Sequence, residues 1–258
     1  MLCGLLAVNW FYSKPFDKRM SQGEVKVVMT TLSVIQNAAK AANLTFFLFA
    51  GSLLGSYRHH GIIPWDDDID IIFNHEDKSK VEAALRSKER FGYSYFVPSE
   101  SNLPFHNNNC KFFPSQTGSF VHKVPFSYFN WPFVDIFFFR ENSSHIWDAT
   151  KVKNGLHALK SHVYPLIDRP FGSLMLPAPC NPVEVLRGYN LNYCHSGDFN
   201  HKLDIATNPL TRQMVACDQL SSAVPMVRRR QNSSHVNETL VVGGRVLNTV
   251  TLPLCQHP

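Results

Sequence analysis

The sequence WDDDIDIIF, residues 65–73, places four aspartates directly beside an apolar run, a pattern that few folds accommodate. Because side chains alternate along an extended strand, Asp68 and Asp70 share one face. Ile69 and Ile71 then point into the sheet. Two like charges on one face repel each other, and a hard divalent cation is the usual means of holding them together. We therefore expect Mg²⁺ or Mn²⁺ at this pair, bridged to a substrate phosphate.

Two small residues, Gly51 and Ser52, directly follow the apolar run TFFLFA of residues 45–50. A turn of small residues lets backbone N–H groups and a hydroxyl approach a phosphate with no Cβ in the way. An isolated Asp-x-Asp at a strand end is more often a solvated turn. Here, however, a small-residue turn and a loop precede two aspartates on a neighbouring strand, which is the arrangement of a nucleotidyltransferase site.

A third carboxylate is expected from another strand, and Asp135 is the candidate. It is the only acid in the run FVDIFFF of residues 133–139, where a charge is strongly disfavoured without a partner. The alternative is an aspartate at a strand end that is solvated or paired with Arg140. Three acids on adjacent strands can hold two metal ions, one at the incoming oxygen and one at the leaving phosphate.

Helices and strands alternate over the first 140 residues, which indicates an α/β or α+β domain. We expect one domain over residues 21–190, after an N-terminal segment of residues 1–20. Apolar periodicity predicts helices over residues 22–42, 77–90 and 145–162, strands over residues 45–50, 69–73, 91–97 and 133–139, and polar loops before the aspartates and around residues 107–109.

Residues 191–258 differ from the preceding sequence because they are rich in Ser, Asn and Pro. We interpret them as an irregular C-terminal tail that is peripheral or poorly ordered. One hairpin is expected in it, turning at Gly243 and Gly244. The run Arg228–Arg230 is interpreted first as a solvated or cleavable segment and second as an anion site.

Cysteines and sequons bear on the compartment. The six cysteines include no Cys-x-x-Cys pair, so a structural zinc site is not expected. They are either free buried thiols or, in a secretory compartment, disulfides, with Cys180–Cys194 or Cys217–Cys255 as the pairings considered. Four N-glycosylation sequons favour a luminal or secreted protein: Asn43, Asn142, Asn232 and Asn237.

The N-terminus carries an apolar run, residues 2–8, that is too short to span a bilayer and lacks a basic segment before it. It is either the remnant of a membrane anchor that lies upstream or an ordinary buried segment. Both interpretations stay open at this point.

Charge and missing motifs exclude several function classes. The net charge is +5, but the basic residues are scattered, so a groove for nucleic acid is not expected. Charged residues make up only 17% of the chain, below the roughly 25% of an average soluble domain, which excludes a disordered polyelectrolyte. The sequence contains no P-loop, no G-x-G-x-x-G turn and no G-x-S-x-G elbow, so kinase, dinucleotide and esterase functions have no residues to carry them.

The segment GSLLGSYRHHGIIPWDDDIDI, residues 51–71, resembles the signature of the LicD family, which includes the bacterial phosphocholine transferases, fukutin and fukutin-related protein. Further matches follow in the family's order: VDIFFF around Asp135, VYPL at residues 163–166, RPFGSLMLPAP at residues 169–179 and LRGYN at residues 186–190. The resemblance covers roughly residues 22–190 and implies a nucleotidyltransferase-like mixed sheet flanked by helices.

The resemblance implies transfer of a phospho-alcohol, ribitol phosphate or phosphocholine, from a cytidine diphosphate (CDP) donor to a glycan or glycoprotein acceptor. It also implies a place in the secretory pathway, in the Golgi lumen or membrane. The match assigns Asp68, Asp70 and Asp135 to a Mg²⁺ or Mn²⁺ site, and Gly51, Ser52 and Arg58 to the donor phosphates. A loop salt bridge from Arg58 to Asp66 or Asp67 is an equally open alternative.

Other side chains near the aspartates have two interpretations each. His59 and His60 are a general base or ligand, or, more commonly, exposed loop histidines. Trp65 stacks on a base or sugar, or packs beside Pro64.

Three functions follow: a metal-dependent luminal transferase, a non-catalytic relative in the secretory pathway that binds a glycan or a partner, and a cytosolic nucleotidyltransferase. The three acids favour the first over the second, because a binding module has no need of three charges held together. The sequons and the scattered basic charge weaken the third.

Overall fold

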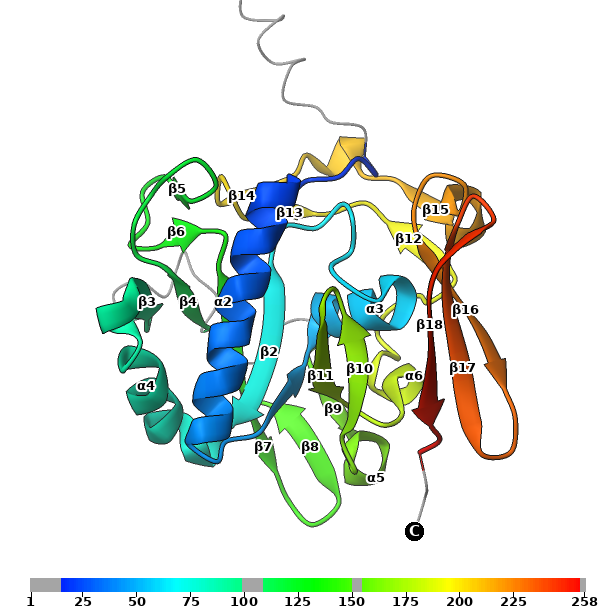
Figure 1. Ribbon diagram of the computed structural model, residues 1–258, viewed down its shortest axis with the longest axis horizontal. Helices are drawn as coiled ribbons and strands as arrows, with labels where there is room; N and C mark the ends of the chain where they lie inside the picture. The colour runs from blue at the N-terminus through cyan, green and yellow to red at the C-terminus, as the bar shows by residue number, and fades with distance from the viewer. Residues whose placement is uncertain (1–14, 99–108, 150–154, 256–258) are drawn as a thin grey trace, which may run out of the picture.

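A mixed seven-stranded sheet forms the centre of the computed structural model, which describes residues 15–98, 109–149 and 155–255 (Figure 1). Five strands lie in the order β1 (Phe46–Leu48), β2 (Ile69–Asn74), β7 (Val134–Glu141), β4 (Cys110–Pro114) and β3 (Tyr93–Phe96), and β8 (His145–Asp148) and β9 (His157–Leu159) extend the sheet beside β7. The pair β2 and β7 is parallel, whereas β7 is antiparallel to β4 and β8. The α/β fold class with a mixed sheet is confirmed.

Helices α2 (Gln22–Ala41) and α4 (Lys78–Arg86) contact each other and pack on the sheet. A capping box begins α2, as the sequence predicts: Glu24 accepts from the Ser21 N–H at 2.8 Å, and Ser21 Oγ accepts from the Glu24 N–H at 3.3 Å. A third helix, α3 (Ala50–His59), connects β1 to β2. Two short helices follow, α5 (Lys160–Val163) and α6 (Pro182–Val185).

The sheet carries a hydrophobic layer on each face, and the two layers contain alternate residues of the same strands. On the α2 face, Ile35 belongs to one buried cluster with Ile71 and Ile136. On the other face, Ile72 and Phe137 belong to a second buried cluster. The alternation predicted for residues 69–73 is therefore confirmed.

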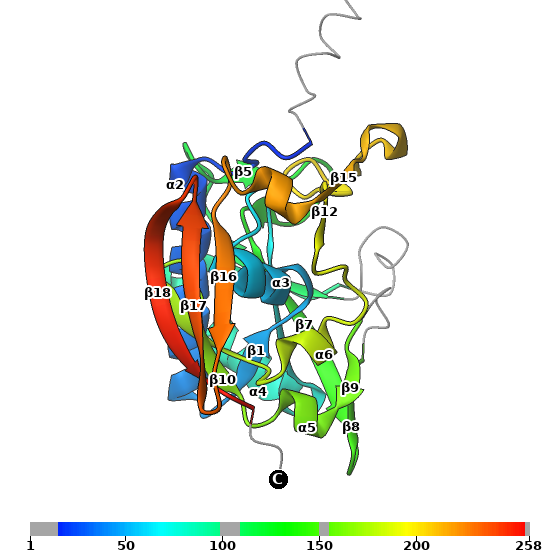
Figure 2. The same cartoon turned by 90° about the vertical axis from the view of Figure 1, so that its right-hand side faces the viewer.

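The C-terminal region holds more regular structure than its composition suggests. Within it, β12 (Tyr193–His195) pairs with β15 (Met214–Ala216), and β13 (Phe199–Asn200) pairs with β14 (Ile205–Ala206). Two further pairs lie earlier in the chain: β5 (His122–Lys123) with β6 (Asn130–Trp131), and β10 (Ile167–Phe171) with β11 (Leu174–Ala178). A three-stranded antiparallel sheet follows, β16 (Met226–Gln231), β17 (His235–Val242) and β18 (Arg245–Pro253). Figure 1 shows this sheet on the side away from β3 and α4, and Figure 2 shows it beside α3.

The expectation of an irregular tail is therefore wrong for residues 226–253, whereas the turn at Gly243 and Gly244 is confirmed, with both glycines at positive φ. The division of the chain into a domain over residues 21–190 and an appended segment stays a prediction.

A buried ion cluster joins β17 to the central part of the molecule. Glu238, 1% exposed, contacts His60 Nε2 at 2.9 Å, Arg169 Nη2 at 2.8 Å through both oxygens, and Arg229 Nε at 2.8 Å. We call these four residues the Glu238 cluster. Burial raises the pKa of Glu238, but the His60 hydrogen bond and the Arg169 and Arg229 charges outweigh it and lower the pKa to about 2. Arg229 thus belongs to an ion cluster, which corrects the solvated interpretation for that residue, whereas Arg228 and Arg230 are exposed.

Two disulfides, Cys180–Cys255 and Cys194–Cys217, tie the C-terminal region together. Both pairings considered from the sequence are wrong, and free thiols are wrong for these four residues. Strand pairing explains the partners: β12 carries Cys194, and the antiparallel β15 ends directly before Cys217. Cys110 is free and buried on β4.

Two sequence-predicted elements differ from the structure. The helix expected over residues 145–162 is instead β8, β9 and the single turn of α5, in the part of that interval that is described. The loop expected after Gly51 is instead α3, because small residues let this helix pack closely: a Cβ on Gly55 would lie 2.3 Å from the Gly61 carbonyl oxygen.

Across the described residues, none of the helices combines the length and the apolar character needed to cross a membrane. The N-terminal apolar run of residues 2–8 and most of the polar loop expected at residues 107–109 lie outside the described residues.

Candidate metal and phosphate site

Three of the predicted site residues, Asp68, Asp70 and Asp135, come together at one place in the structure. Asp70 on β2 and Asp135 on β7 are register partners across the parallel pair, and Asp68 precedes β2. One carboxylate oxygen from each of the three lies within 4.8 Å of the others, and all three residues are buried. We call these three residues the aspartate site.

Excess negative charge dominates the electrostatics of the aspartate site. Burial raises the pKa of Asp68 well above its usual value, and the charges of Asp66 and Asp135 raise it further. Burial and the charges of Asp68 and Asp135 raise the pKa of Asp70 in the same way. Carboxylate oxygens are hard donors, and a divalent cation would relieve the repulsion between them. The residues present therefore fit a Mg²⁺ or Mn²⁺ ion.

Lys111, which sequence reasoning missed, supplies a positive charge at the edge of the site. It lies on β4 opposite Asp135, and its Nζ donates to Asp135 Oδ1 at 2.5 Å. The ammonium group also lies 3.8 Å from the ring centroid of Phe133. Asp135 thus pairs with Lys111 and not with Arg140, whose guanidinium contacts His75. The lone lysine in the apolar run CKFFP was a signal of the same kind as the lone acid in FVDIFFF.

The first turn of α3 places Gly51 and Ser52 against the aspartates. Ser52 Oγ accepts from the Asp70 backbone N–H at 2.8 Å. A Cβ on Gly51 would lie 3.2 Å from Asp66 Oδ2 and 3.4 Å from Asp70 Oδ2, so a larger residue would crowd the site. Backbone N–H groups in the first turn of a helix have no partner within the helix and favour anions. The structure therefore brings the first turn of a helix next to the carboxylates.

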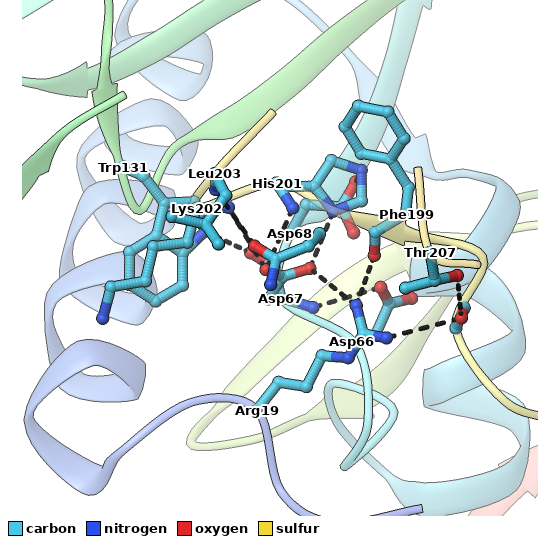
Figure 3. Close-up of polar contacts among 12 residues, drawn as sticks. Arg19, Asp66, Asp67, Asp68, Trp131, Phe199, His201, Lys202, Leu203 and Thr207 are labelled. Atoms are coloured by element: carbon cyan, nitrogen blue, oxygen red, sulfur yellow. Dashed lines mark hydrogen bonds and ion pairs between the residues drawn. The ribbon is translucent and has the colours of Figure 1, made fainter. Parts of the chain in front are cut away.

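A second missed residue, His201, reaches the site from the loop after β13 (Figure 3). Its Nδ1 lies 2.8 Å from Asp67 Oδ1, and its Nε2 lies 3.2 Å from Asp68 Oδ2. Burial lowers the pKa of His201, but the hydrogen bond and charge of Asp67 outweigh it, together with the charge of Asp66, and the pKa is raised overall. No local sequence pattern around His201 marks it as a site residue.

Arg58 lies elsewhere. It is buried on α3, with Nη1 3.5 Å from the Tyr193 carbonyl oxygen and 3.5 Å from Cys217 Sγ. Among the ion pairs between described residues, none joins Arg58 to Asp66 or Asp67, and it is Arg19 that lies 3.8 Å from Asp67. The structure therefore separates Arg58 from the residues that it gathers at the aspartate site.

His59, His60 and Trp65 are all buried, so the expectation of exposed loop histidines is wrong. His59 Nδ1 contacts the Pro225 carbonyl oxygen at 2.7 Å, and burial together with the Arg58 charge lowers its pKa to about 3. His60 belongs to the Glu238 cluster. Trp65 donates to the His195 carbonyl at 2.8 Å and packs on Phe16, so the packing interpretation is the one that the structure favours.

The glycosylation sequons lie at the surface to different degrees. Asn43, Asn142 and Asn232 are exposed, whereas Asn237 on β17 is half-buried and accepts from Thr251 Oγ1 at 2.7 Å. Three of the four sites are thus accessible to modification.

Curated relatives match somewhat more than half of the chain. The uncharacterized protein RP689 of Rickettsia prowazekii is 29% identical over 145 residues, which is 55% of this chain and 45% of that protein. The ribitol-5-phosphate transferase FKTN of Homo sapiens is 28% identical over 161 residues, which is 59% of this chain and 30% of that protein. The chain therefore spans less than half the length of these relatives.

The family model for the LicD/FKTN/FKRP nucleotidyltransferase domain matches residues 43–181, more than half of the chain. This interval contains α3, β2, β4 and β7, and with them the aspartate site, Lys111 and the Gly51–Ser52 turn. The glycine-rich start of α3, the aspartates before β2 and the lone acid of β7 are thus features of one family domain, and the chain belongs to the LicD family.

Proposed function

We propose that this protein is a metal-dependent transferase that moves a phospho-alcohol, of the ribitol phosphate or phosphocholine type, from a CDP-activated donor to a glycan acceptor. The observation that carries the proposal is the aspartate site, where three buried carboxylates lie within 4.8 Å of one another beside the first turn of a helix and the pKa values of Asp68 and Asp70 are raised. The FKTN relatives, which are named ribitol-5-phosphate transferases, support this class of reaction.

In the proposed reaction, an acceptor hydroxyl oxygen forms a bond to the donor phosphorus that bears the alcohol. The bond from that phosphorus to the oxygen bridging to cytidine monophosphate breaks, cytidine monophosphate leaves, and the hydroxyl proton is released. Mg²⁺ or Mn²⁺, when bound, would neutralise the phosphate charge and polarise the reacting oxygens.

The chain's own residues orient these groups. Asp68, Asp70 and Asp135 would hold the metal ion, and the N–H groups of Gly51 and Ser52 would hold donor phosphate oxygens. Lys111 fixes the orientation of Asp135 and adds a positive charge beside the phosphates. Arg58, buried by the Cys194–Cys217 disulfide, supports α3 rather than the phosphates.

We also place the protein in the secretory pathway, in the Golgi lumen or membrane. Two disulfides and three exposed sequons support an oxidising, glycosylating compartment. Glycosidase-sensitive mass on the secreted or luminal protein, lost in an Asn43→Gln, Asn142→Gln, Asn232→Gln variant, tests this placement, and a chain without glycans in cells would contradict it.

The test of the activity is a panel of CDP-alcohols, CDP-ribitol and CDP-choline among them, assayed for binding and for release of cytidine monophosphate. We expect binding and release only with Mg²⁺ or Mn²⁺, and loss of both in Asp68→Asn and Asp70→Asn. Asp218→Asn, which changes an exposed acid on the C-terminal region, is the matched control and should retain activity. If no donor binds the folded wild type, the non-catalytic binding function replaces this proposal.

A further inference from the structure

Residues 199–203, which comprise β13 and the start of the loop that follows it, lie over the aspartate turn of residues 66–68 (Figure 3). We call residues 199–203 the clasp. It comes from the C-terminal region, outside the interval that the family model matches. The clasp therefore adds to the site something that the family domain does not itself contain.

The clasp contacts both carboxylate oxygens of Asp67, a residue that is 2% exposed. Asp67 Oδ2 accepts from the backbone N–H of His201 at 3.0 Å and of Lys202 at 3.3 Å, and Asp67 Oδ1 lies 2.8 Å from His201 Nδ1. Trp131 Nε1 donates to the Asp67 carbonyl oxygen at 2.6 Å. The three hydrogen bonds from the clasp use three of the roughly four lone-pair sites of the Asp67 carboxylate, so Asp67 anchors the clasp.

The clasp is also held at a point outside the aspartates. Lys202 Nζ donates to Glu24 Oε1 at 2.7 Å and lies 4.8 Å from the ring centroid of Trp131. Glu24 is fixed in turn by the capping box of α2. The position of the clasp therefore does not depend on the His201 ring alone.

With Nδ1 committed to Asp67, the imidazole of His201 directs Nε2 at Asp68 Oδ2, 3.2 Å away. The ring is packed edge-on against Phe133, with ring centroids 6.2 Å apart, and near Phe199 at 5.0 Å. A carboxylate among like charges rotates away from them unless a contact holds it. Groups that orient a metal ligand typically change metal affinity by about 10- to 100-fold when they are removed.

We propose that His201 is a positioning residue that fixes the carboxylate of Asp68 in the orientation in which the aspartate site binds its cation. The proposal rests on the metal-dependent function proposed above and extends it, because it gives the C-terminal region a defined part in the site. It requires that the effect of His201 on metal binding pass through Nε2, while Nδ1 serves only to anchor the ring.

Two substitutions separate the roles of the ring nitrogens. His201→Asn keeps an amide donor near the position of Nδ1 and removes Nε2, whereas His201→Gln can place an amide donor near the position of Nε2. The measured quantity is Mn²⁺ binding to the full chain. The decrease of the free-ion signal in electron paramagnetic resonance reports it, and no donor or acceptor substrate is needed. We expect about 10- to 100-fold weaker Mn²⁺ binding in His201→Asn and a recovery to within about threefold in His201→Gln. His157→Asn, on exposed β9, is the matched control.

A third variant keeps the test decisive if His201→Asn does not fold. Lys202→Met removes the contact with Glu24 and loosens the clasp from outside the aspartates, and we expect it to weaken Mn²⁺ binding by about threefold or more. Unchanged binding in the folded variants overturns the positioning role and leaves the proposed function intact. A wild type that binds no Mn²⁺ removes both proposals. A directly coordinated ¹⁴N coupling in the pulsed spectrum of wild-type Mn²⁺ protein overturns positioning as well, because it makes His201 a ligand.

Discussion

The aspartate site and the Glu238 cluster are both buried groups of charges, yet their balances are opposite. The aspartate site gathers three carboxylates, with Lys111 and His201 as the nearby cations. The Glu238 cluster surrounds one carboxylate with a histidine and two arginines. Their pKa shifts follow the balance, raised for Asp68 and Asp70 and lowered to about 2 for Glu238.

The two charge balances distinguish buried charges that stabilise the fold from buried charges that bind a ligand. A carboxylate whose partners are all within the protein contributes to folding and has no need of anything else. Carboxylates that repel each other oppose folding until a cation arrives, so they belong to a binding site. Changes at the two places should therefore affect different properties of the protein.

The largest effect is expected for Asp70→Asn. Removal of one charge from the aspartate site should lower transfer activity by about 10³-fold or more, since the metal ion loses a ligand. Stability in metal-free buffer should stay equal or rise, because repulsion is relieved. Rates of cytidine monophosphate release and chemical denaturation of the same samples measure the two properties. A variant that loses activity only by unfolding would contradict the contrast.

The next largest effect is expected for Glu238→Ala. This substitution leaves Arg169 and His60 buried without their partner and should cost about 3–5 kcal/mol in the free energy of unfolding. Urea denaturation measures the loss, with Glu89→Ala on the exposed surface as a control expected within about 0.5 kcal/mol of wild type. A loss below about 1 kcal/mol would show that the cluster is not what ties β17 to the sheet.

Lowering the pH should change the stability contributed by Glu238 and by the aspartate site in opposite directions. The pKa of Glu238 falls from an ordinary 4.5 to about 2 in the folded state, so its stabilisation is fully present above pH 4.5 and is lost as the pH falls toward 2. The loss should amount to about 3 kcal/mol. The raised pKa values of Asp68 and Asp70 act in the opposite direction, because protonation relieves their repulsion. The free energy of unfolding, measured by denaturation at each pH between 5 and 2, should depend less on pH in Glu238→Gln than in the wild type. An equal pH dependence in the two proteins would contradict the assignment.

The smallest effect is stabilisation by the cation itself. Mn²⁺ at about ten times its dissociation constant should raise the free energy of unfolding by about 1.4 kcal/mol, because only the folded aspartate site binds it. The Asp70→Asn variant should show no such rise, whereas Glu238→Gln should show the full rise. Thermal unfolding with and without Mn²⁺ measures it, and an equal rise in all three proteins would mean that the ion binds elsewhere.

Local sequence patterns predict the three aspartates of the site, but they do not predict His201. Alternation in WDDDIDIIF predicts that Asp68 and Asp70 share a face, and the lone acid of FVDIFFF indicates Asp135. His201 lies more than 60 residues further along in a polar loop, so only the folded chain brings it to Asp67. Patterns within a strand are local, whereas the clasp is a long-range contact.

The same limit applies to the fold. The periodicity of residues 22–42 and 69–73 is strong and predicts α2 and β2 closely. Helix α3 contains Gly51, Ser52 and Gly55, which favour turns, and it forms because close packing with neighbouring backbone overrides these preferences. The partners in the Cys194–Cys217 disulfide depend on the pairing of β12 with β15, which cysteine spacing does not encode.

The parallel register of β2 and β7 also bears on how faithfully the chain folds. Asp70 and Asp135 face each other across this pair, on the face of the sheet opposite α2. A slip of β7 by one residue would turn its side chains to the opposite face and carry Asp135 into the apolar layer under α2. The cost of burying a lone carboxylate there would reject the misaligned pairing. Asp135, the acid that completes the site, thus also disfavours incorrect strand registers during folding.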